Sequence, residues 1–208
     1  MFTLTFNGFS SEDFRIFQIE GLAQRMEAIQ QHIQPKFKEI GEELTTYLTS
    51  KLGIEMFLHI AKHARRTKNP PNDTWLAIAN NKRGYKKHPH FQVGLFDDRV
   101  FIWLAFIYEL PNKQQIANRF TQNMEVIHSL PNDFVISQDH MKKEAISLAE
   151  SDLTKILKQF HDVKKAEFLI GRQIKSTDPL LTDGQAFIKE TKSTFDSLLP
   201  LYKFVIHH

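Results

Sequence analysis

The chain has 208 residues and no cysteine, so it can bury a core in one domain and has neither disulfides nor thiolate metal sites. Lys and Arg number 27 against 24 Asp and Glu, for a formal net charge of +3. We expect a single domain over residues 1–208 in the reducing cytoplasm, where proteins rarely form disulfides. The longest apolar run, residues 100–108, is too short to span a membrane, and residues 1–14 lack the pattern of a signal peptide.

The first fifty residues predict helices. Ser10 and Asp13 form a pattern that is typical of a helix cap. Apolar residues then recur at helical spacing over residues 22–33. Pro35 is predicted to begin a further helix, because proline is tolerated in the first turn, and Gly53 is predicted to end it.

The middle of the chain predicts four strands, at residues 56–65, 74–79, 90–96 and 99–109. Asp97 and Asp98 suit a two-residue hairpin turn between the last two strands. Such a short turn fixes the register and would place His90 opposite Ala105. The fourth strand is apolar on both faces, so it is predicted to be central in its sheet and covered on both sides.

The last hundred residues return to helix, with short strands expected at residues 134–136 and 166–174. Thr182 and Gln185 predict the cap of a long final helix, and residues 203–208 are predicted to form a tail. Strands that are grouped between helices predict an α+β class. We therefore expect a single domain in which a mostly antiparallel mid-chain sheet is flanked by N- and C-terminal helices.

No local catalytic or cofactor motif is present. The sequence has no Walker loop, Gly-rich dinucleotide turn, serine-hydrolase elbow or His-Glu-x-x-His, so we predict no cofactor. The charge distribution is more informative, because residues 51–90 carry nine Lys or Arg against only Glu55 and Asp73. This segment has a formal charge of +7, against +3 for the whole chain. Such asymmetry bears on the partner of a protein and not on its fold.

The basic segment predicts a site for an anionic ligand. The candidate residues are Lys62, His63, Arg65, Arg66, Lys82, Arg83, Tyr85, Lys86, Lys87 and His90. Arg and Lys together suit phosphate, and Tyr85 and Trp75 are candidates for stacking on a base. The predicted partner is therefore a nucleic acid or a phosphate-bearing small molecule such as a nucleotide. A solvated basic rim that balances acidic helices is the alternative interpretation.

Three further hypotheses concern other chemistry. No metal site is predicted, but His88, His90 and Glu109 form a weaker alternative set, because His-x-His and a carboxylate on adjacent strands can bind a metal. An enzyme that acts on an anionic metabolite would use His63, His90 or His140 as acid or base. A protein-interaction or structural role is the third hypothesis, and the sequence predicts no oligomeric state.

Several strings of residues also resemble a known family. They include KHARRT at 62–67, NPP at 69–71, DTW at 73–75, KRGYKK at 82–87 and DHMK at 139–142. Together they resemble the YktB-like family of proteins from Firmicutes, over nearly the whole chain. The resemblance implies a cytoplasmic single-domain α+β fold with no assigned activity, and it supplies no catalytic residues.

Overall fold

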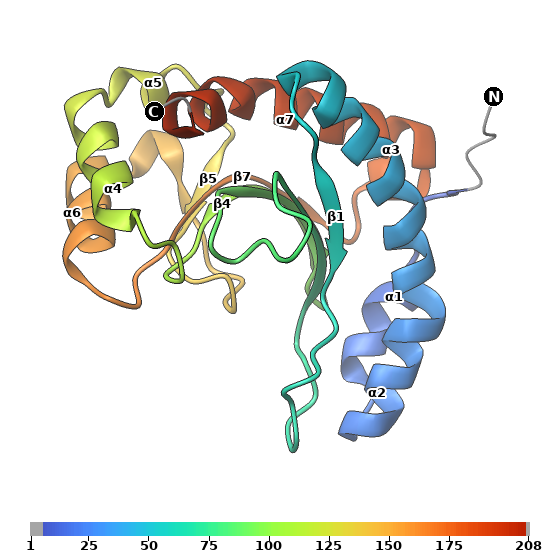
Figure 1. The fold of residues 1–208 in the computed structure, drawn as a ribbon. Coiled ribbons are helices and arrows are strands. Elements are labelled where there is room, and N and C mark those ends of the chain that lie inside the picture. Colours follow the sequence, from blue (N-terminus) through green and yellow to red (C-terminus); the bar gives the residue numbers. More distant parts are fainter. Residues whose placement is uncertain (1–5, 207–208) are drawn as a thin grey trace.

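The computed structural model describes residues 6–206, which form one antiparallel seven-stranded sheet flanked by helices (Figure 1). The strand order is β1-β2-β3-β4-β7-β5-β6. The strands are β1 (Phe57–Ile60), β2 (Thr74–Ala79), β3 (His90–Leu95), β4 (Arg99–Phe106), β5 (Val135–Ser137), β6 (Ile146–Ser147) and β7 (Phe168–Lys175). The predicted α+β class and single domain are confirmed. Among the described residues, no helix is long and apolar enough to cross a membrane.

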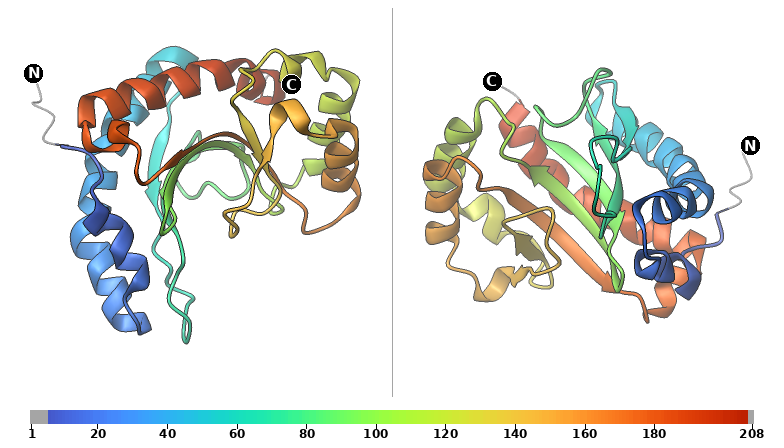
Figure 2. Two further views of the ribbon diagram at one scale, coloured as in Figure 1. Left: turned by 180° about the vertical axis from the view of Figure 1, so that it is seen from behind. Right: turned by 90° about the horizontal axis from the view of Figure 1, so that it is seen from below.

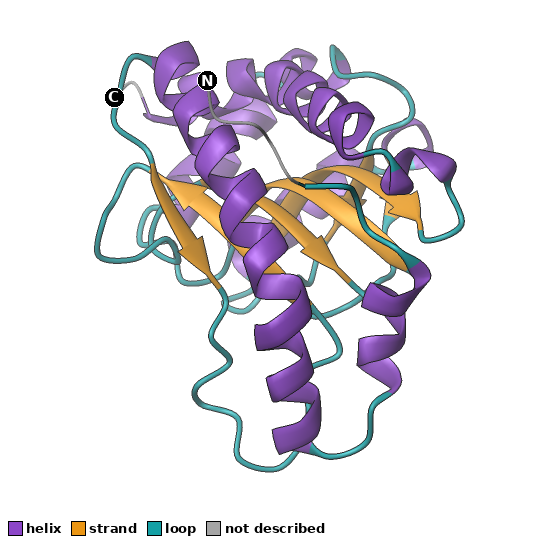
Figure 3. Cartoon of the chain, turned by 90° about the vertical axis from the view of Figure 1, so that its right-hand side faces the viewer, coloured by secondary structure: helices purple, strands orange, loops and turns teal. Residues whose placement is uncertain are grey.

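Helices cover one face of the sheet, and connecting loops cover the other (Figures 1 and 3). The helices are α1 (Ser11–Arg15), α2 (Leu22–Ala28), α3 (Gln34–Leu52), α4 (Lys113–Gln122), α5 (Glu125–His128), α6 (Leu153–Asp162) and α7 (Gly184–Ile206). α3 contacts β1 and β2, α7 contacts β4 and β7, and α4 packs beside α6 (Figure 2). We call the two sides of the sheet the helix face and the loop face.

The central strand β4 is buried on both faces, as its sequence predicted. Val100, Ile102 and Leu104 point toward α3 and α7 and belong to the main hydrophobic core. Phe101, Trp103 and Ala105 point to the loop face, where they form a smaller apolar cluster with Trp75, Phe96 and Leu169. The loop face therefore has its own apolar surface, against which polar side chains from the loops can pack.

The predicted hairpin between β3 and β4 is confirmed. Phe96 N donates to Arg99 O at 2.9 Å, so Asp97 and Asp98 form the turn, and His90 lies opposite Ala105. The predicted strand over residues 99–109 is too long, since β4 ends at Phe106. The chain turns there, and Leu110 N donates to Ile107 O at 3.1 Å.

The N-terminal helices confirm three predicted boundaries. Ser10 N donates to Asp13 Oδ2 at 2.7 Å in the predicted cap, and Gly53 ends α3 with a left-handed φ of 68°. As predicted, Pro35 lies in the first turn of α3, which begins at Gln34, although a π-helix at Ile29–Ile33 joins α2 directly to α3. The wider π turn precedes the proline, which has no N–H to donate, so the helical run continues through it.

Strand β1 is shorter than the predicted strand at residues 56–65. It ends at Ile60, and only Ala61 N extends the pairing, with a hydrogen bond to Trp75 O at 2.9 Å. His63 then takes a positive φ of 48°, which interrupts any extended strand. The long loop that follows runs from residue 61 to 73 and rejoins the sheet at β2.

The final helix also differs from its prediction at both ends. Asp183, and not Thr182, caps α7, because its Oδ1 accepts from Ala186 N at 3.0 Å. Thr182 Oγ1 instead donates to Pro179 O at 2.9 Å. The predicted tail at residues 203–208 is wrong up to Ile206, since α7 continues to that residue and buries Val205. Residues 207–208 lie outside the described part of the chain.

Candidate functional site

A pocket of about 750 Å³ opens between the edge strand β1 and the loop 80–89, which joins β2 to β3. Four of its lining residues are Lys or Arg, namely Lys62, Arg83, Lys86 and Lys87, and His59 and His88 also line it. Glu109 is the one carboxylate in the described lining, and its Oε1 lies 3.3 Å from Lys86 Nζ. The pocket therefore has a clear excess of positive charge, and we call it the basic pocket.

The two basic clusters converge because the loop 80–89 folds back over the sheet. This loop leaves the far end of β2, whereas Lys62 follows β1 at the opposite end. Trp75, near the start of β2, donates from Nε1 to the hydroxyl oxygen of Tyr85 at 3.1 Å. That bond holds the loop against the loop face and brings Arg83 into the same pocket as Lys62.

Other members of the predicted set lie outside this pocket. Arg65 and Lys82 are exposed and do not line it. Arg66 turns back on its own loop, where its guanidinium approaches Asn69 O at 3.4 Å and Pro70 O at 3.5 Å. The basic segment is thus divided into a group that shares one pocket and a group that faces solvent or its own loop.

His63 and His90 do not contribute positive charge at neutral pH. Burial lowers the pKa of His63 to about 4, aided by the nearby charge of Arg66, and its Nε2 lies 3.2 Å from Thr74 Oγ1. His90 is fully buried, and burial lowers its pKa to about 3. Both are therefore neutral side chains of the loop face and not cationic groups of an anion site.

The alternative metal set of His88, His90 and Glu109 is not assembled in the structure. His90 Nδ1 donates to His88 O at 2.8 Å, and its Nε2 accepts from Gln92 Nε2 at 2.9 Å. Both ring nitrogens of His90 are thus already engaged, and Glu109 faces Lys86. These existing bonds leave no shared position for an ion.

The two aromatic residues that were candidates for base stacking are used inside the fold. Trp75 is buried, and its ring lies edge-on to His63 at 5.4 Å and to His140 at 5.8 Å between centroids. The Tyr85 ring packs against His90 at 4.8 Å, and burial raises the pKa of its hydroxyl to about 12. Tyr85 still forms part of the pocket wall, but Trp75 is not free to stack on a base.

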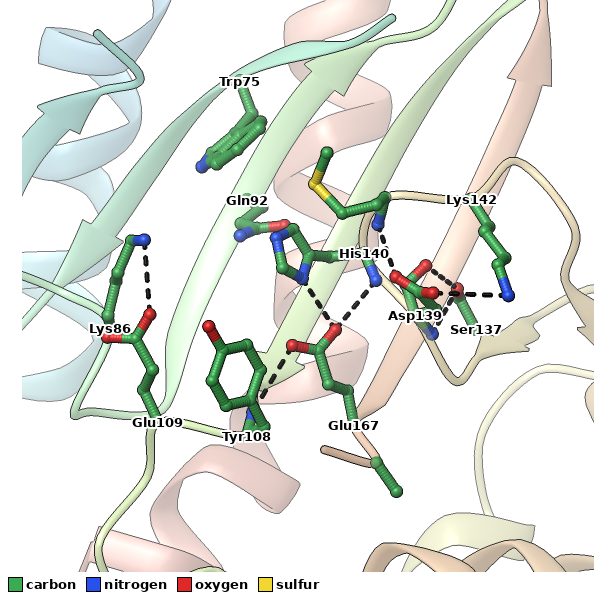
Figure 4. A network of polar contacts seen from close by, with 12 residues as sticks. Trp75, Lys86, Gln92, Tyr108, Glu109, Ser137, Asp139, His140, Lys142 and Glu167 are labelled. Carbon is green, nitrogen blue, oxygen red and sulfur yellow. Dashed lines mark hydrogen bonds and ion pairs between the residues drawn. The ribbon is translucent and has the colours of Figure 1, made fainter. Parts of the chain in front are cut away.

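A second group of polar residues lies nearby on the loop face (Figure 4). Glu167, just before β7, is 3% exposed, and its Oε2 accepts from His140 Nδ1 at 2.7 Å and from His140 N at 2.8 Å. Its Oε1 accepts from Tyr108 N at 3.4 Å. Burial disfavours protonation of His140, but the hydrogen bond and charge of Glu167 outweigh it and raise the pKa of the imidazole.

Asp73 lies in the same region and is fully buried. Within residues 6–206, neither of its carboxylate oxygens has a hydrogen-bond partner in another residue. Burial raises the pKa of Asp73 to about 6, although the charges of His140 and Arg66 act in the opposite direction. An unpaired buried carboxylate is costly to a fold, so its presence here is an unusual feature of the loop face.

Sequence reasoning found His140 as an acid–base candidate but missed Glu167 and the importance of Asp73. A signal for Glu167 was present, because a lone carboxylate directly precedes the apolar strand residues 168–170. The sequence near Glu167 does not show that His140 is its hydrogen-bond partner. The contact depends on β5 pairing with β7, with Ser137 opposite Leu169, which brings the loop 138–145 over the sheet.

Comparison with known proteins places the chain in a family. A family model described as "Domain of unknown function (DUF1054)" matches residues 9–202. The chain belongs to this family. A UPF0637 protein from Oceanobacillus iheyensis is 59% identical over 201 residues, which cover 96% of this chain and 97% of the relative. One from Listeria monocytogenes is 55% identical over 200 residues, covering 96% and 98%.

A third relative, from Shouchella clausii, is 58% identical over 197 residues, covering 94% of this chain and 93% of its own. These matches to proteins of Firmicutes confirm the resemblance to the YktB-like family. The names of these relatives state a family and no activity.

Proposed function

We propose that the chain binds a phosphate-bearing ligand, either a nucleotide or a nucleic acid, in the basic pocket. The observation that carries this proposal is the meeting of Lys62 with Arg83, Lys86 and Lys87 in one cavity, although they come from two different loops. A guanidinium offers paired donors that match phosphate oxygens, and lysines add point charges around it. The cavity volume of about 750 Å³ lies within the range of roughly 300–1,000 Å³ for small-molecule sites.

The walls of the pocket are also held in place by the fold. Leu58, His59 and Ile60 of β1 form one wall, and Tyr85, anchored to Trp75, forms another. The cations at the rim are exposed, whereas this wall is half-buried. Such a site would attract an anion over a distance and then hold it against a fixed surface. In this proposal the protein acts in the cytoplasm, as expected for a chain without cysteine.

The first prediction concerns binding through the basic pocket. We expect the purified protein to bind nucleoside triphosphates or labelled single-stranded RNA at low salt, measured by calorimetry and fluorescence anisotropy. Affinity should fall steeply with salt, because binding to phosphates releases counterions. Lys62→Ala and Arg83→Ala should each weaken binding, and on RNA each should reduce the salt slope by about 1.

Matched controls separate this pocket from general positive charge. Arg65→Ala and Lys82→Ala each remove one exposed cation from the same two loops, outside the pocket. They should change affinity much less than the pocket variants. Equal losses in all four variants would indicate a diffuse basic surface, and no binding of any of these ligands at low salt would end the proposal.

The two alternatives gain less support. The enzyme hypothesis requires His63, His90 or His140 in a deep pocket together with Arg65 or Arg83. The basic pocket contains Arg83 but is lined by His59 and His88, and none of the three named histidines lines it. Under the protein-interaction hypothesis, the chain should bind an acidic polypeptide such as polyglutamate more tightly than RNA or nucleotides in the same titrations.

A further inference from the structure

Three donor side chains meet on the loop face, apart from the basic pocket. Asp139, His140 and Glu167 each present a donor atom, and these atoms all lie within 4.8 Å of one another. Asp139 and His140 belong to the loop between β5 and β6, and Glu167 directly precedes β7. Figure 4 shows their side chains side by side beneath Trp75 and Gln92.

The present contacts leave part of each donor available. Among the described residues, Glu167 Oε1 accepts only the long 3.4 Å hydrogen bond from Tyr108 N. Asp139 Oδ1 accepts from Met141 N at 2.9 Å, and its Oδ2 lies 3.5 Å from the exposed Lys142 ammonium. The 2.7 Å contact between His140 Nδ1 and Glu167 Oε2 is a hydrogen bond, so an ion that binds both of these atoms must displace the proton between them.

Asp73 provides an independent observation at the same place. It is fully buried, and both of its carboxylate oxygens lack a partner in any other residue that the structure describes. It directly precedes β2, two residues before Trp75, whose ring lies 5.8 Å from the His140 ring. The charge of His140 lowers the pKa of the Asp73 carboxyl group, and the charge of Asp139 raises it. The charges of His140 and Arg66 offset the effect of burial only in part, and a bound cation would offset it further.

We infer that Asp139, His140 and Glu167 form a binding site for one divalent transition-metal ion, with Asp73 as a further carboxylate that balances its charge. A nitrogen ligand with two carboxylates suits Zn²⁺ or Mn²⁺ better than Ca²⁺ or Mg²⁺, which prefer oxygen ligands throughout. The backbone N–H groups of Tyr108 and Met141 orient two of the carboxylates, as second partners do in metal sites. The site does not depend on the proposed function of the basic pocket.

The experiment is a titration of the whole chain, prepared without an affinity tag and freed of metal with a chelator. Calorimetry with ZnCl2 and with MnCl2 should give one ion bound per chain for at least one of the two metals. The same metal should raise the midpoint of thermal unfolding, because an ion that binds only the folded state stabilises it. His140→Ala should weaken binding by more than about 100-fold, since loss of a ligand exceeds the effect of losing a partner of a ligand.

Two more variants guard against misfolding and general effects. Asp139→Asn changes a side chain that is 42% exposed, so the variant should fold normally and still weaken binding by at least about tenfold. His161→Ala is the matched control, because His161 Nδ1 and Asp162 Oδ1 form an exposed pair at the same 2.7 Å, with no third donor from the described part of the chain. It should bind the metal like the unmodified chain.

The inference is overturned if neither ion binds and neither shifts the unfolding midpoint. It is equally overturned if Asp139→Asn binds the metal as tightly as His161→Ala. Asp73→Asn supplies an additional measurement, because it should weaken binding by about tenfold while leaving all three proposed ligands in place.

Discussion

At the scale of single residues, burial on the loop face decides which groups carry charge. His63 and His90 stand among lysines in the sequence, yet burial lowers the pKa of these imidazoles to about 4 and about 3. The positive charge of the basic pocket therefore comes from Lys and Arg at neutral pH. Asp73 shows the opposite case, in which burial raises the pKa of a carboxyl group to about 6.

The buried carboxylate leads to a prediction about stability. The pKa of Asp73 is about 6 in the folded chain and about 3.8 in the unfolded chain, so the folded state is destabilised as pH rises through this window. Below pH 3.8 the carboxyl is neutral in both states, and above pH 6 the full penalty is present. Asp73→Asn removes the charge but leaves a buried amide, so we expect a stabilisation of about 1–3 kcal/mol at pH 8.

The measurement is urea unfolding of both proteins at pH 8 and pH 4, in the presence of a chelator. The advantage of Asp73→Asn should be large at pH 8 and much smaller at pH 4, because protonation then removes the charge from the unmodified chain as well. An advantage that is equal at the two pH values, or a less stable variant at pH 8, would show that the buried charge of Asp73 does not destabilise the fold.

At the scale of elements, β4 contributes buried side chains to the apolar clusters on both faces of the sheet. Trp103 is 2% exposed and stacks on Phe101 at 5.9 Å between ring centroids. Trp103→Ala should therefore lower the free energy of unfolding by about 3–5 kcal/mol, through lost burial and the cavity left behind. The measurement is chemical unfolding, and Lys82→Ala, an exposed change in a loop, is the control that should have little effect. A loss below about 1 kcal/mol for Trp103→Ala would contradict the packing of this face.

The elements also show how far the sequence could predict the structure. The hairpin at Asp97 and Asp98 was predictable to the residue, because a two-residue turn fixes register locally. The end of β1 was not, since it depends on the positive φ of His63, which no sequence pattern signals. Glu167 was also missed, because its contact with His140 depends on the pairing of β7 with β5, which are distant in sequence.

At the scale of the whole molecule, the two faces of the sheet have different roles. The helix face carries the large core beneath α3 and α7 and stabilises the fold. The loop face holds both candidate sites, because the loops 80–89 and 138–145 lie against it, through the Trp75–Tyr85 and His140–Glu167 hydrogen bonds, while the loop 61–73 extends beyond the end of β1 (Figures 1 and 4). The sequence predicted which residues were basic, but only this long-range folding brings part of that segment together and leaves the rest apart.

The long helix α7 connects these regions, and its C-terminal end gives the last prediction. α7 crosses the helix face and contacts β4, β7, α3 and α5. Near its end the Phe204 ring stacks on Phe120 at 6.1 Å, Arg119 donates to Phe204 O, and Val205 is buried. A chain that ends at Tyr202 loses these contacts and should be less stable by about 2–5 kcal/mol, from the apolar burial removed. A chain that ends at Ile206 keeps them and is the matched control, so equal unfolding midpoints in urea for the two truncated chains would show that the last turn of α7 does not support the fold.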